Sequence, residues 1–228
     1  MSRLTEYDAQ GIVAEAQQVI NRYLQPGLGA ELSTKTYDDT SEKYDDYCAA
    51  FEHLGPAKTA EIAGSLYPDP KQRETVRILD VAAGTGMVGV ELQKLGFRHM
   101  DALDPSRAML DVAKSRGVYI SFFCNYIDDK QLPIDENTYD CLTVSGGMGE
   151  NQIPCCALHE MIRLVKPGGY IVNVTRQEHL KNCSDYIGRL EPLMEQLEQE
   201  GKWKQITRAN FPNLLRGKEG LLLVHQVL

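Results

Sequence analysis

Residues 78–89 read ILDVAAGTGMVG, and the segment from Gly84 to Gly89 matches the G-x-G-x-x-G pattern of dinucleotide-binding loops. Glycines that follow a first buried strand let backbone N–H groups approach a ligand at a place where a side chain would collide with it. Asp104 closes a second apolar segment, and its carboxylate can accept hydrogen bonds from both ribose hydroxyls of an adenosine. These residues predict an adenosine-containing ligand, and they suit NAD and S-adenosylmethionine equally well.

Asp80 distinguishes the two ligands, because it lies in the first strand, four residues before Gly84. A carboxylate there repels the anionic pyrophosphate of NAD, whereas it can balance the α-ammonium group of a methionine moiety. The sequence therefore favours S-adenosylmethionine. The residues expected to bind it are Asp80, Ala82, Gly84 and Gly86 near the amino-acid end and Asp104 at the ribose.

Strand and helix patterns alternate from residue 75 onward. Apolar runs predict strands at 76–81, 99–103, 118–123, 139–145 and 170–175, and helical periodicity predicts helices at 86–95, 107–115 and 157–165. Ser106 is expected to cap the second of these helices. Outside this region we expect helices at 7–25, 46–66 and 183–200 and a final pair of strands at 203–211 and 220–227.

This alternation predicts an α/β fold with a Rossmann-like, seven-strand, mostly parallel sheet, helices on both faces and an antiparallel hairpin at the C-terminal edge. The prolines of YPDP at 67–70 mark a boundary, so residues 1–70 are expected to form an N-terminal helical lid and residues 71–228 the main domain. Ligands bind at the carboxyl ends of the strands in such sheets. The loops expected around the site are therefore 82–86, 104–106, 124–128, 145–152 and 175–179.

Three further segments follow in order, ALDPSRAML at 102–110, LPIDENTYDCL at 132–142 and LVKPGGYIV at 164–172. Together with the glycine loop they resemble the class I S-adenosylmethionine-dependent methyltransferases over residues 76–175. YDDTSEKYDDY at 37–47 and SGGMGENQIP at 145–154 extend the likeness over residues 35–228, to the methyltransferase-like proteins of the Williams–Beuren syndrome chromosomal region. The resemblance implies an enzyme of class EC 2.1.1.-, with S-adenosylmethionine as methyl donor and S-adenosylhomocysteine as product.

Ala82 departs from the family pattern, which has glycine as the first residue of this loop. Alanine tolerates strand conformations but not a positive φ. We therefore expect Ala82 to keep an extended backbone and Gly84 and Gly86 to make the close approach.

The resemblance also implies roles for residues outside the glycine loop. Tyr37 and Tyr44 would close over the cofactor, with Tyr44 also taking part in catalysis; the alternative is a solvated acidic turn whose aromatic side chains pack on the sheet. One residue among Asn125, Tyr126 and Asp128 would bind the adenine amino group. The remaining residues expected at the cofactor are Pro105, Met109 and Ser145.

The loop after the fourth strand is expected to face the methyl acceptor, through Gly147, Met148, Glu150 and Asn151. Glu150 could deprotonate or position an acceptor and Asn151 could orient it, so both are candidate catalytic residues. The alternative is a flexible loop with a helix cap at Asn151. Arg176 could pair with an acceptor carboxylate, or form a surface ion pair.

Composition limits the remaining possibilities. A formal net charge of −8 weighs against non-specific nucleic-acid binding, and no apolar run is long enough to span a membrane. Without an N-terminal signal peptide, six scattered cysteines indicate reduced thiols and a cytoplasmic protein. Cys155 and Cys156 with His159 make a poor metal site, so no metal is expected. The acidic charge and the surrounding sequence also argue against a nucleophilic Pro154-Cys155 pair like that of cytosine-C5 methyltransferases.

The sequence thus predicts a methyltransferase, monomeric or homodimeric, that acts on a nitrogen, oxygen or sulfur atom of a small molecule. The chain is too short for a separate domain that would bind a macromolecular target. Two alternatives stay open. One is a protein or RNA methyltransferase that requires a partner, and the other is a non-catalytic module that only binds the cofactor.

Overall fold

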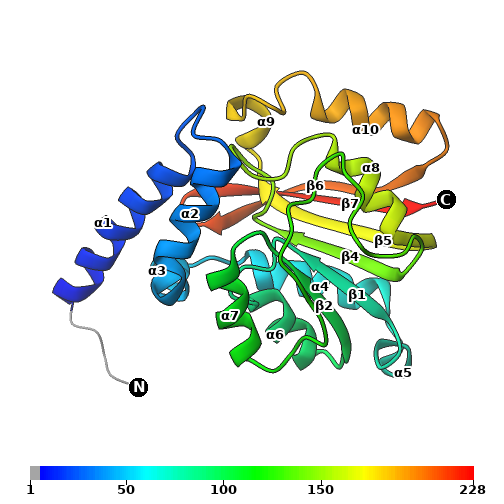
Figure 1. The fold of residues 1–228 in the computed structure, drawn as a ribbon, viewed down its shortest axis with the longest axis horizontal. Coiled ribbons are helices and arrows are strands. Elements are labelled where there is room, and N and C mark those ends of the chain that lie inside the picture. The colour runs from blue at the N-terminus through cyan, green and yellow to red at the C-terminus, as the bar shows by residue number, and fades with distance from the viewer. Residues whose placement is uncertain (1–5) are drawn as a thin grey trace.

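A single seven-stranded sheet runs through the centre of the computed structural model, which describes residues 6–228, with side chains from residue 11 onward (Figure 1). The strand order is β3-β2-β1-β4-β5-β7-β6. The strands are β1 (Arg77–Val81), β2 (His99–Leu103), β3 (Phe122–Phe123), β4 (Tyr139–Ser145), β5 (Val165–Arg176), β6 (Trp203–Leu215) and β7 (Lys218–Val227). Strands β1 to β5 pair in parallel, whereas β7 runs antiparallel to both β5 and β6. The predicted sheet and its antiparallel C-terminal hairpin are confirmed.

Helices cover both faces of the sheet (Figure 1). One face carries α4 (Gly55–Leu66), α6 (Met87–Lys94) and α7 (Arg107–Ser115), and the other carries α8 (Ala157–Leu164) and α10 (Leu190–Gln199). Two single-turn helices, α5 (Pro70–Arg73) and α9 (His179–Asn182), lie in connections. The N-terminal segment contains α1 (Glu6–Tyr23), α2 (Ala30–Thr40), the 3-10 turn η1 (Ser41–Lys43) and α3 (Tyr44–Ala50), and it lies at the edge where the parallel strands end.

The two sheet faces bury separate apolar clusters, because successive side chains of a strand point to opposite faces. In β1, Ile78 joins the cluster that contains α4 and α6, and Leu79 joins the cluster that contains α8 and α10. Both side chains are fully buried. A third, smaller cluster holds α1 and α3 together through Ala16, Val19, Tyr23 and Tyr47. The N-terminal segment therefore has apolar packing of its own.

Helix boundaries follow local signals. The side chain of Ser106 accepts a hydrogen bond from the N–H of Met109 at 3.1 Å and so caps α7, as predicted. The predicted helix at 46–66 is split into α3 and α4, because Glu52 takes a left-handed φ of 53° and Pro56 opens α4. The predicted helix at 183–200 starts only after Gly188, which has a φ of 65°.

The predicted strand at 118–123 is reduced to Phe122–Phe123. Upstream of it the backbone bonds irregularly, with the N–H of Ile120 donating to the carbonyl of Met100 and that of Ser121 to the Asp101 side chain. The boundary predicted at residue 70 stays a prediction. The helix α4 precedes this boundary in the chain, yet it packs on α6, β4 and β5, which follow the boundary.

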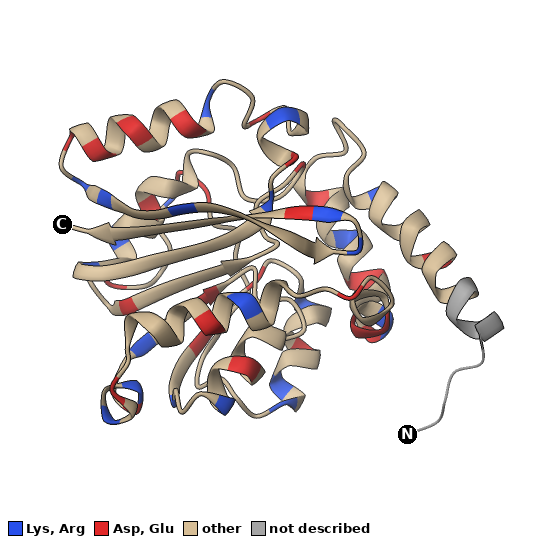
Figure 2. Cartoon of the chain, turned by 180° about the vertical axis from the view of Figure 1, so that it is seen from behind, with Lys and Arg blue, Asp and Glu red and all other residues tan. Residues whose placement is uncertain are grey.

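Charged side chains of both signs are spread over the helices and connections (Figure 2). α10 carries acidic residues along its length, whereas most of the sheet is uncharged. Within residues 6–228, no helix is both long and apolar enough to cross a bilayer.

Gly89, the last glycine of the fingerprint, is required by packing. Its N–H donates to the hydroxyl of Tyr119 at 3.1 Å, and that hydroxyl donates to Asp80 at 2.6 Å. A Cβ on Gly89 would lie 2.5 Å from the Tyr119 hydroxyl oxygen. This glycine therefore makes room for a buried tyrosine.

Gly89→Ala is expected to lower the free energy of unfolding by about 1–3 kcal/mol, because overpacking a buried site costs about this much. Urea unfolding followed by circular dichroism measures it. In a Tyr119→Ala background the same substitution should cost far less, since its collision partner is gone. Equal costs in the two backgrounds would contradict the assignment.

The matched control is Gly11→Ala in α1, where a Cβ would meet no atom within 4 Å. It should stabilise the protein by about 0.5–1 kcal/mol, the usual gain of alanine over glycine inside a helix.

Candidate functional site

A cavity of about 660 Å³ opens at the carboxyl ends of the parallel strands. Its wall combines α2 with the loops that follow β1, β2, β3 and β4, as expected for a ligand site in such a sheet. Thirteen of the predicted site residues lie on this wall: Tyr37, Tyr44, Ala82, Gly84, Asp104, Pro105, Met109, Asn125, Tyr126, Ser145, Gly147, Glu150 and Asn151. Asp80, Gly86, Met148 and Arg176 do not.

Asp104 is held in place by two backbone groups. One carboxylate oxygen accepts from the N–H of Gly84 and the other from the N–H of Ser106, both at 2.8 Å. Burial raises the pKa of Asp104 to about 6 although these two bonds favour its ionised form. Each oxygen keeps a further lone pair for a donor in the cavity.

The glycine loop turns through three residues with positive φ, Ala82 at 54°, Gly84 at 54° and Gly86 at 87°. The prediction of an extended backbone at Ala82 is therefore wrong. The chain must turn sharply where β1 ends, and the Ala82 side chain fits because Gly147 faces it; a Cβ on Gly147 would lie 2.5 Å from that of Ala82. A left-handed alanine costs about 1–2 kcal/mol, which the surrounding packing offsets.

Gly84 and Gly86 have different roles. No atom lies within 4 Å of a Cβ built on Gly84, which lines the cavity, so its missing side chain leaves space there. Gly86 begins α6 away from the wall and packs against Tyr119. The predicted direct approach to the ligand thus fits Gly84, while Gly86 shapes the turn.

Asp80 lies beneath the cavity floor. Its oxygens accept from the hydroxyls of Tyr119 and Thr143 at 2.6 and 2.9 Å, and its exposed fraction is 1%. Burial raises its pKa to about 7. Both oxygens are engaged inside the core, by Tyr119 of the connection before β3 and by Thr143 of β4, so Asp80 does not line the cavity and its predicted contact with the ligand stays a prediction.

The loop after β4 holds two predicted catalytic residues in structural contacts. Ser184 donates to Glu150 through its N–H and its hydroxyl, both at 2.8 Å. Burial raises the pKa of Glu150, but these bonds outweigh it and the net pKa lies below its usual value. Glu150 is therefore a weak base.

Asn151 binds the N-terminal segment. Its amide donates to the carbonyls of Tyr23 and Gln25, at 3.0 and 2.9 Å, and its oxygen accepts from the N–H of Gly29 at 3.0 Å. These bonds occupy both the amide nitrogen and the oxygen of Asn151, the side chain that was expected to orient the acceptor. Asn151 also caps no helix, since α8 begins only at Ala157.

Met148 and Arg176 lie away from the main wall. Met148 is fully buried, and its sulfur accepts from the amide of Asn173. Met148 therefore does not line the main cavity, and its predicted contact with the acceptor stays a prediction. Arg176 lines a smaller neighbouring cavity, together with Tyr37 and Tyr44.

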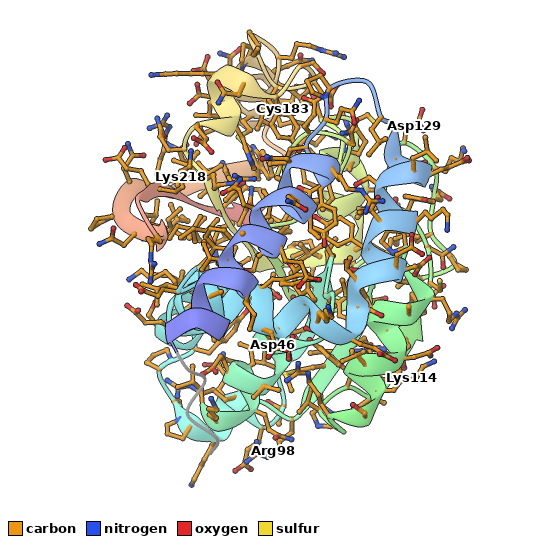
Figure 3. All side chains as sticks on the ribbon, turned by 90° about the vertical axis from the view of Figure 1, so that its left-hand side faces the viewer. Asp46, Arg98, Lys114, Asp129, Cys183 and Lys218 are labelled. Atoms are coloured by element: carbon orange, nitrogen blue, oxygen red, sulfur yellow. The ribbon has the colours of Figure 1, made fainter. Side chains whose placement is uncertain are left out.

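The N-terminal segment forms one wall of the main cavity. Figure 3 faces α1 and α2, which lie side by side with α7 below α2. Tyr37 stacks on Tyr23 with ring centroids 4.0 Å apart and meets Tyr44 edge-on at 6.0 Å. Tyr126 donates to the hydroxyl of Thr34 at 3.0 Å. Both predicted lid tyrosines thus reach the cavity.

Sequence reasoning missed several residues that organise this site. Asp38 accepts from the hydroxyl of Ser106 at 2.6 Å and from the N–H of Ala108 at 3.2 Å, which joins α2 to the start of α7. Gln152 donates to the Tyr37 hydroxyl at 2.7 Å. Both residues lie in segments that carried the family resemblance, YDDT and GENQ, so the signal was present but unassigned.

Cys155 does not suit nucleophilic chemistry. Its Sγ donates to the carbonyl of Asp185 at 3.1 Å, and burial raises the pKa of the thiol to about 12. Nucleophilic cysteines instead require a lowered pKa. Within the described side chains, no group of three or more histidine, cysteine, aspartate or glutamate residues could hold a metal ion.

The chemistry of the main cavity distinguishes the two adenosine ligands. Its charged lining, among the described residues, is acidic apart from Lys130. The acidic residues are Glu31, Asp104, Asp128, Glu150 and Asp185. Such a wall repels the pyrophosphate of NAD and attracts the sulfonium and ammonium of S-adenosylmethionine. The apolar surfaces of Met109 and Ile127 beside Asp104 suit an adenosine, so the residues present fit this cofactor.

Comparison with known proteins agrees with this reading. Residues 78–169 match the family model of a methyltransferase domain. Human methyltransferase-like protein 27 is 32% identical over 168 residues, which cover 74% of this chain and 66% of that protein. Demethylmenaquinone methyltransferase from Renibacterium salmoninarum is 42% identical over 140 residues, 60% of this chain and 55% of that one. The matched region thus spans about half to two thirds of the length of these relatives.

Solved structures share the fold. A methyltransferase in complex with the Trm112 activator of Haloferax volcanii aligns with a TM-score of 0.59 and 18% identity, over 84% of this chain and 97% of that one. The [4+2]-cyclase SpnF aligns with a TM-score of 0.61 and 15% identity, over 90% and 97%. A cyclase with this architecture shows that the fold alone does not determine the reaction. The family match and the curated relatives together identify residues 78–169 as a class I S-adenosylmethionine-dependent methyltransferase domain, and the solved structures share its fold.

Proposed function

We propose that this chain transfers the methyl group of S-adenosylmethionine to a small-molecule acceptor, at a nitrogen, oxygen or sulfur atom. The observation that carries the proposal is the acidic cavity, in which the Asp104 carboxylate is oriented by the N–H groups of Gly84 and Ser106. The size of the cavity, about 660 Å³, favours a small acceptor, because α2 and its neighbouring loop form one wall and limit the space beside the cofactor site. Demethylmenaquinone methyltransferases, which are among the relatives, are named for a small molecule.

The residues of this chain would bind and orient the reactants. When bound, S-adenosylmethionine supplies an electrophilic methyl group on a sulfonium. Asp104 would accept hydrogen bonds from its ribose, Gly84 would leave space for it, and the N-terminal segment would exclude water. Methyl transfer depends mainly on alignment and desolvation, so the weak basicity of Glu150 is compatible with this function.

The closer assignment and the setting are also proposals. We place the chain with the methyltransferase-like proteins of the Williams–Beuren region, on the strength of segments 37–47 and 145–154 and the match to human methyltransferase-like protein 27. All six cysteines are free thiols in the structure, which supports a reducing compartment such as the cytoplasm. A monomer or homodimer is the expected assembly, and light scattering measures it.

Incubation with methyl-labelled S-adenosylmethionine tests the proposed function. Purified protein should label a component of a small-molecule cell extract and leave protein and RNA fractions unlabelled. Labelling confined to a protein or RNA fraction would favour a macromolecular acceptor. Binding of S-adenosylhomocysteine without transfer to any fraction would favour a module that only binds the cofactor.

Asp104→Ala should weaken S-adenosylhomocysteine binding by on the order of 10–100-fold, since hydrogen bonds to a charged group each contribute about 1.5–3 kcal/mol. Titration calorimetry measures the affinity, and a thermal melt checks folding. Asp111→Ala, which removes the same charge from the exposed surface of α7, should leave binding unchanged. Equal effects of the two variants would contradict the role of Asp104.

The affinity for S-adenosylhomocysteine should fall as the pH drops below about 6. Asp104 has a pKa raised to about 6, so the free protein binds a proton there in acid, whereas ribose hydroxyls require the ionised carboxylate as acceptor. At pH 5 binding should be roughly tenfold weaker than at pH 7, as one pKa unit corresponds to a factor of ten. Calorimetry across this range checks it, and Asp104→Asn should make the loss of affinity between pH 7 and pH 5 much smaller than in the wild-type protein.

A further inference from the structure

A second cavity, of about 90 Å³, lies beside the main one. The two share wall residues Tyr37, Tyr44, Gly146 and Gln152, so a ligand at this boundary faces both. Aromatic and aliphatic side chains of the N-terminal segment form most of the small cavity, and Arg176 and His179 add polar groups to it. A cavity that binds benzene measures about 150 Å³, so only a small head group fits here.

Arg176 brings a poorly compensated positive charge to this cavity. Its side chain is 15% exposed, and its ion pair with Glu178 is long, 3.3 Å between Nη1 and Oε1. Glu178 is also shared with Lys218, at the shorter distance of 2.7 Å. A guanidinium has five N–H donors, and it is costly to bury a guanidinium whose donors have too few acceptors. Burial accordingly lowers the pKa of Arg176.

Two residues on the wall of the same cavity, His179 and Gln152, carry hydrogen-bond acceptors that have no partner among the described residues. Nδ1 of His179 lies 2.7 Å from the carbonyl of Met148, which can only accept, so Nδ1 carries the proton and Nε2 is a bare acceptor. His179 is buried, and its Nε2 has no hydrogen-bond partner among the described residues. Gln152 is similar, because its amide N–H bonds to Tyr37 and its buried oxygen has no partner in the same set.

The ring of His179 is neutral at pH 7. Burial, together with the charge of Arg176, lowers its pKa to about 4. His179 thus accepts a hydrogen bond from a ligand without adding a second positive charge. Buried polar groups are normally satisfied, so a guanidinium with one long acceptor contact beside two acceptors that lack donors indicates a ligand with both functions.

We propose that the methyl acceptor is a small 2-hydroxy acid, or a related acid with an O–H or N–H donor beside its carboxylate. The carboxylate binds Arg176, and the neighbouring donor binds His179 and Gln152. The body of the molecule extends past Tyr37 and Tyr44 into the main cavity and carries the nitrogen, oxygen or sulfur atom that is methylated. The new bond from this atom to the methyl carbon would form as the bond between that carbon and the cofactor sulfur breaks, and a proton on the acceptor atom would pass to solvent. This inference rests on the proposed function of the main cavity as the cofactor site.

Calorimetric titrations of the full chain saturated with S-adenosylhomocysteine test the proposal. The probe is mandelate, an aromatic 2-hydroxy acid. Two matched compounds lack one feature each, mandelamide the negative charge and phenylacetate the hydroxyl. Mandelate should bind most tightly, because only it supplies both groups.

Arg176→Met should weaken mandelate binding by about tenfold or more, as expected for a lost charge-assisted hydrogen bond, and leave S-adenosylhomocysteine binding unchanged. Arg176→Lys should restore part of the affinity. His179→Ala should remove the preference for mandelate over phenylacetate and keep the preference over mandelamide. The matched control is Arg208→Met, which removes an exposed arginine of β6 that pairs with Glu191. It should leave the binding of both mandelate and S-adenosylhomocysteine unchanged.

Several outcomes would overturn the inference. If Arg176→Met weakens the binding of S-adenosylhomocysteine, the guanidinium binds the carboxylate of the cofactor and not that of the acceptor. Equal binding of mandelate and mandelamide, or no binding of any compound to wild-type protein that holds S-adenosylhomocysteine, would reject an acid site. Wild-type protein that fails to bind S-adenosylhomocysteine would instead contradict the proposed function, and the inference would fall with it.

Discussion

The carboxylate of Asp104 joins the ends of β1 and β2, because it accepts one hydrogen bond from Gly84 and another from Ser106. The first bond fixes the left-handed turn of the glycine loop, and the second fixes the start of α7. Ser106 in turn donates to Asp38 of α2, which connects the same point to the N-terminal segment. Three walls of the cavity therefore depend on one side chain. Its burial is costly, and the two backbone donors offset part of that cost.

The N-terminal segment is attached to the rest of the molecule mainly by polar contacts. Its apolar residues pack in a cluster of their own, separate from the two sheet clusters. Hydrogen bonds of Asn151, Asp38 and Gln152 then hold it over the cavity. Each such bond contributes about 0.5–1.5 kcal/mol net, less than the burial of a large apolar side chain. The segment can therefore detach from the sheet at a lower free energy than unfolding of the sheet requires.

The sheet and its edge could be predicted because parallel strands are buried on both faces and appear as apolar runs. The placement of Asp104 and Gly84 followed from the same pattern, since both lie in the loops that directly follow such strands. The errors arose where distant residues decide the local structure. Ala82 adopts a positive φ because Gly147 leaves room for its side chain, and Asn151 binds carbonyls more than 120 positions earlier in the chain. No local spacing encodes either contact.

The glycine fingerprint itself cannot identify the ligand, because its three glycines have three different roles. Gly84 leaves space at the cavity, Gly86 permits the turn into α6, and Gly89 accommodates the ring of Tyr119. The distinction between a dinucleotide and a sulfonium comes from charge. Asp80 does not line the cavity, yet its carboxylate and that of Asp104 are both buried, and burial raises the pKa of each, so a further negative charge nearby would be unfavourable. A cationic methyl donor relieves this repulsion, whereas a pyrophosphate would add to it.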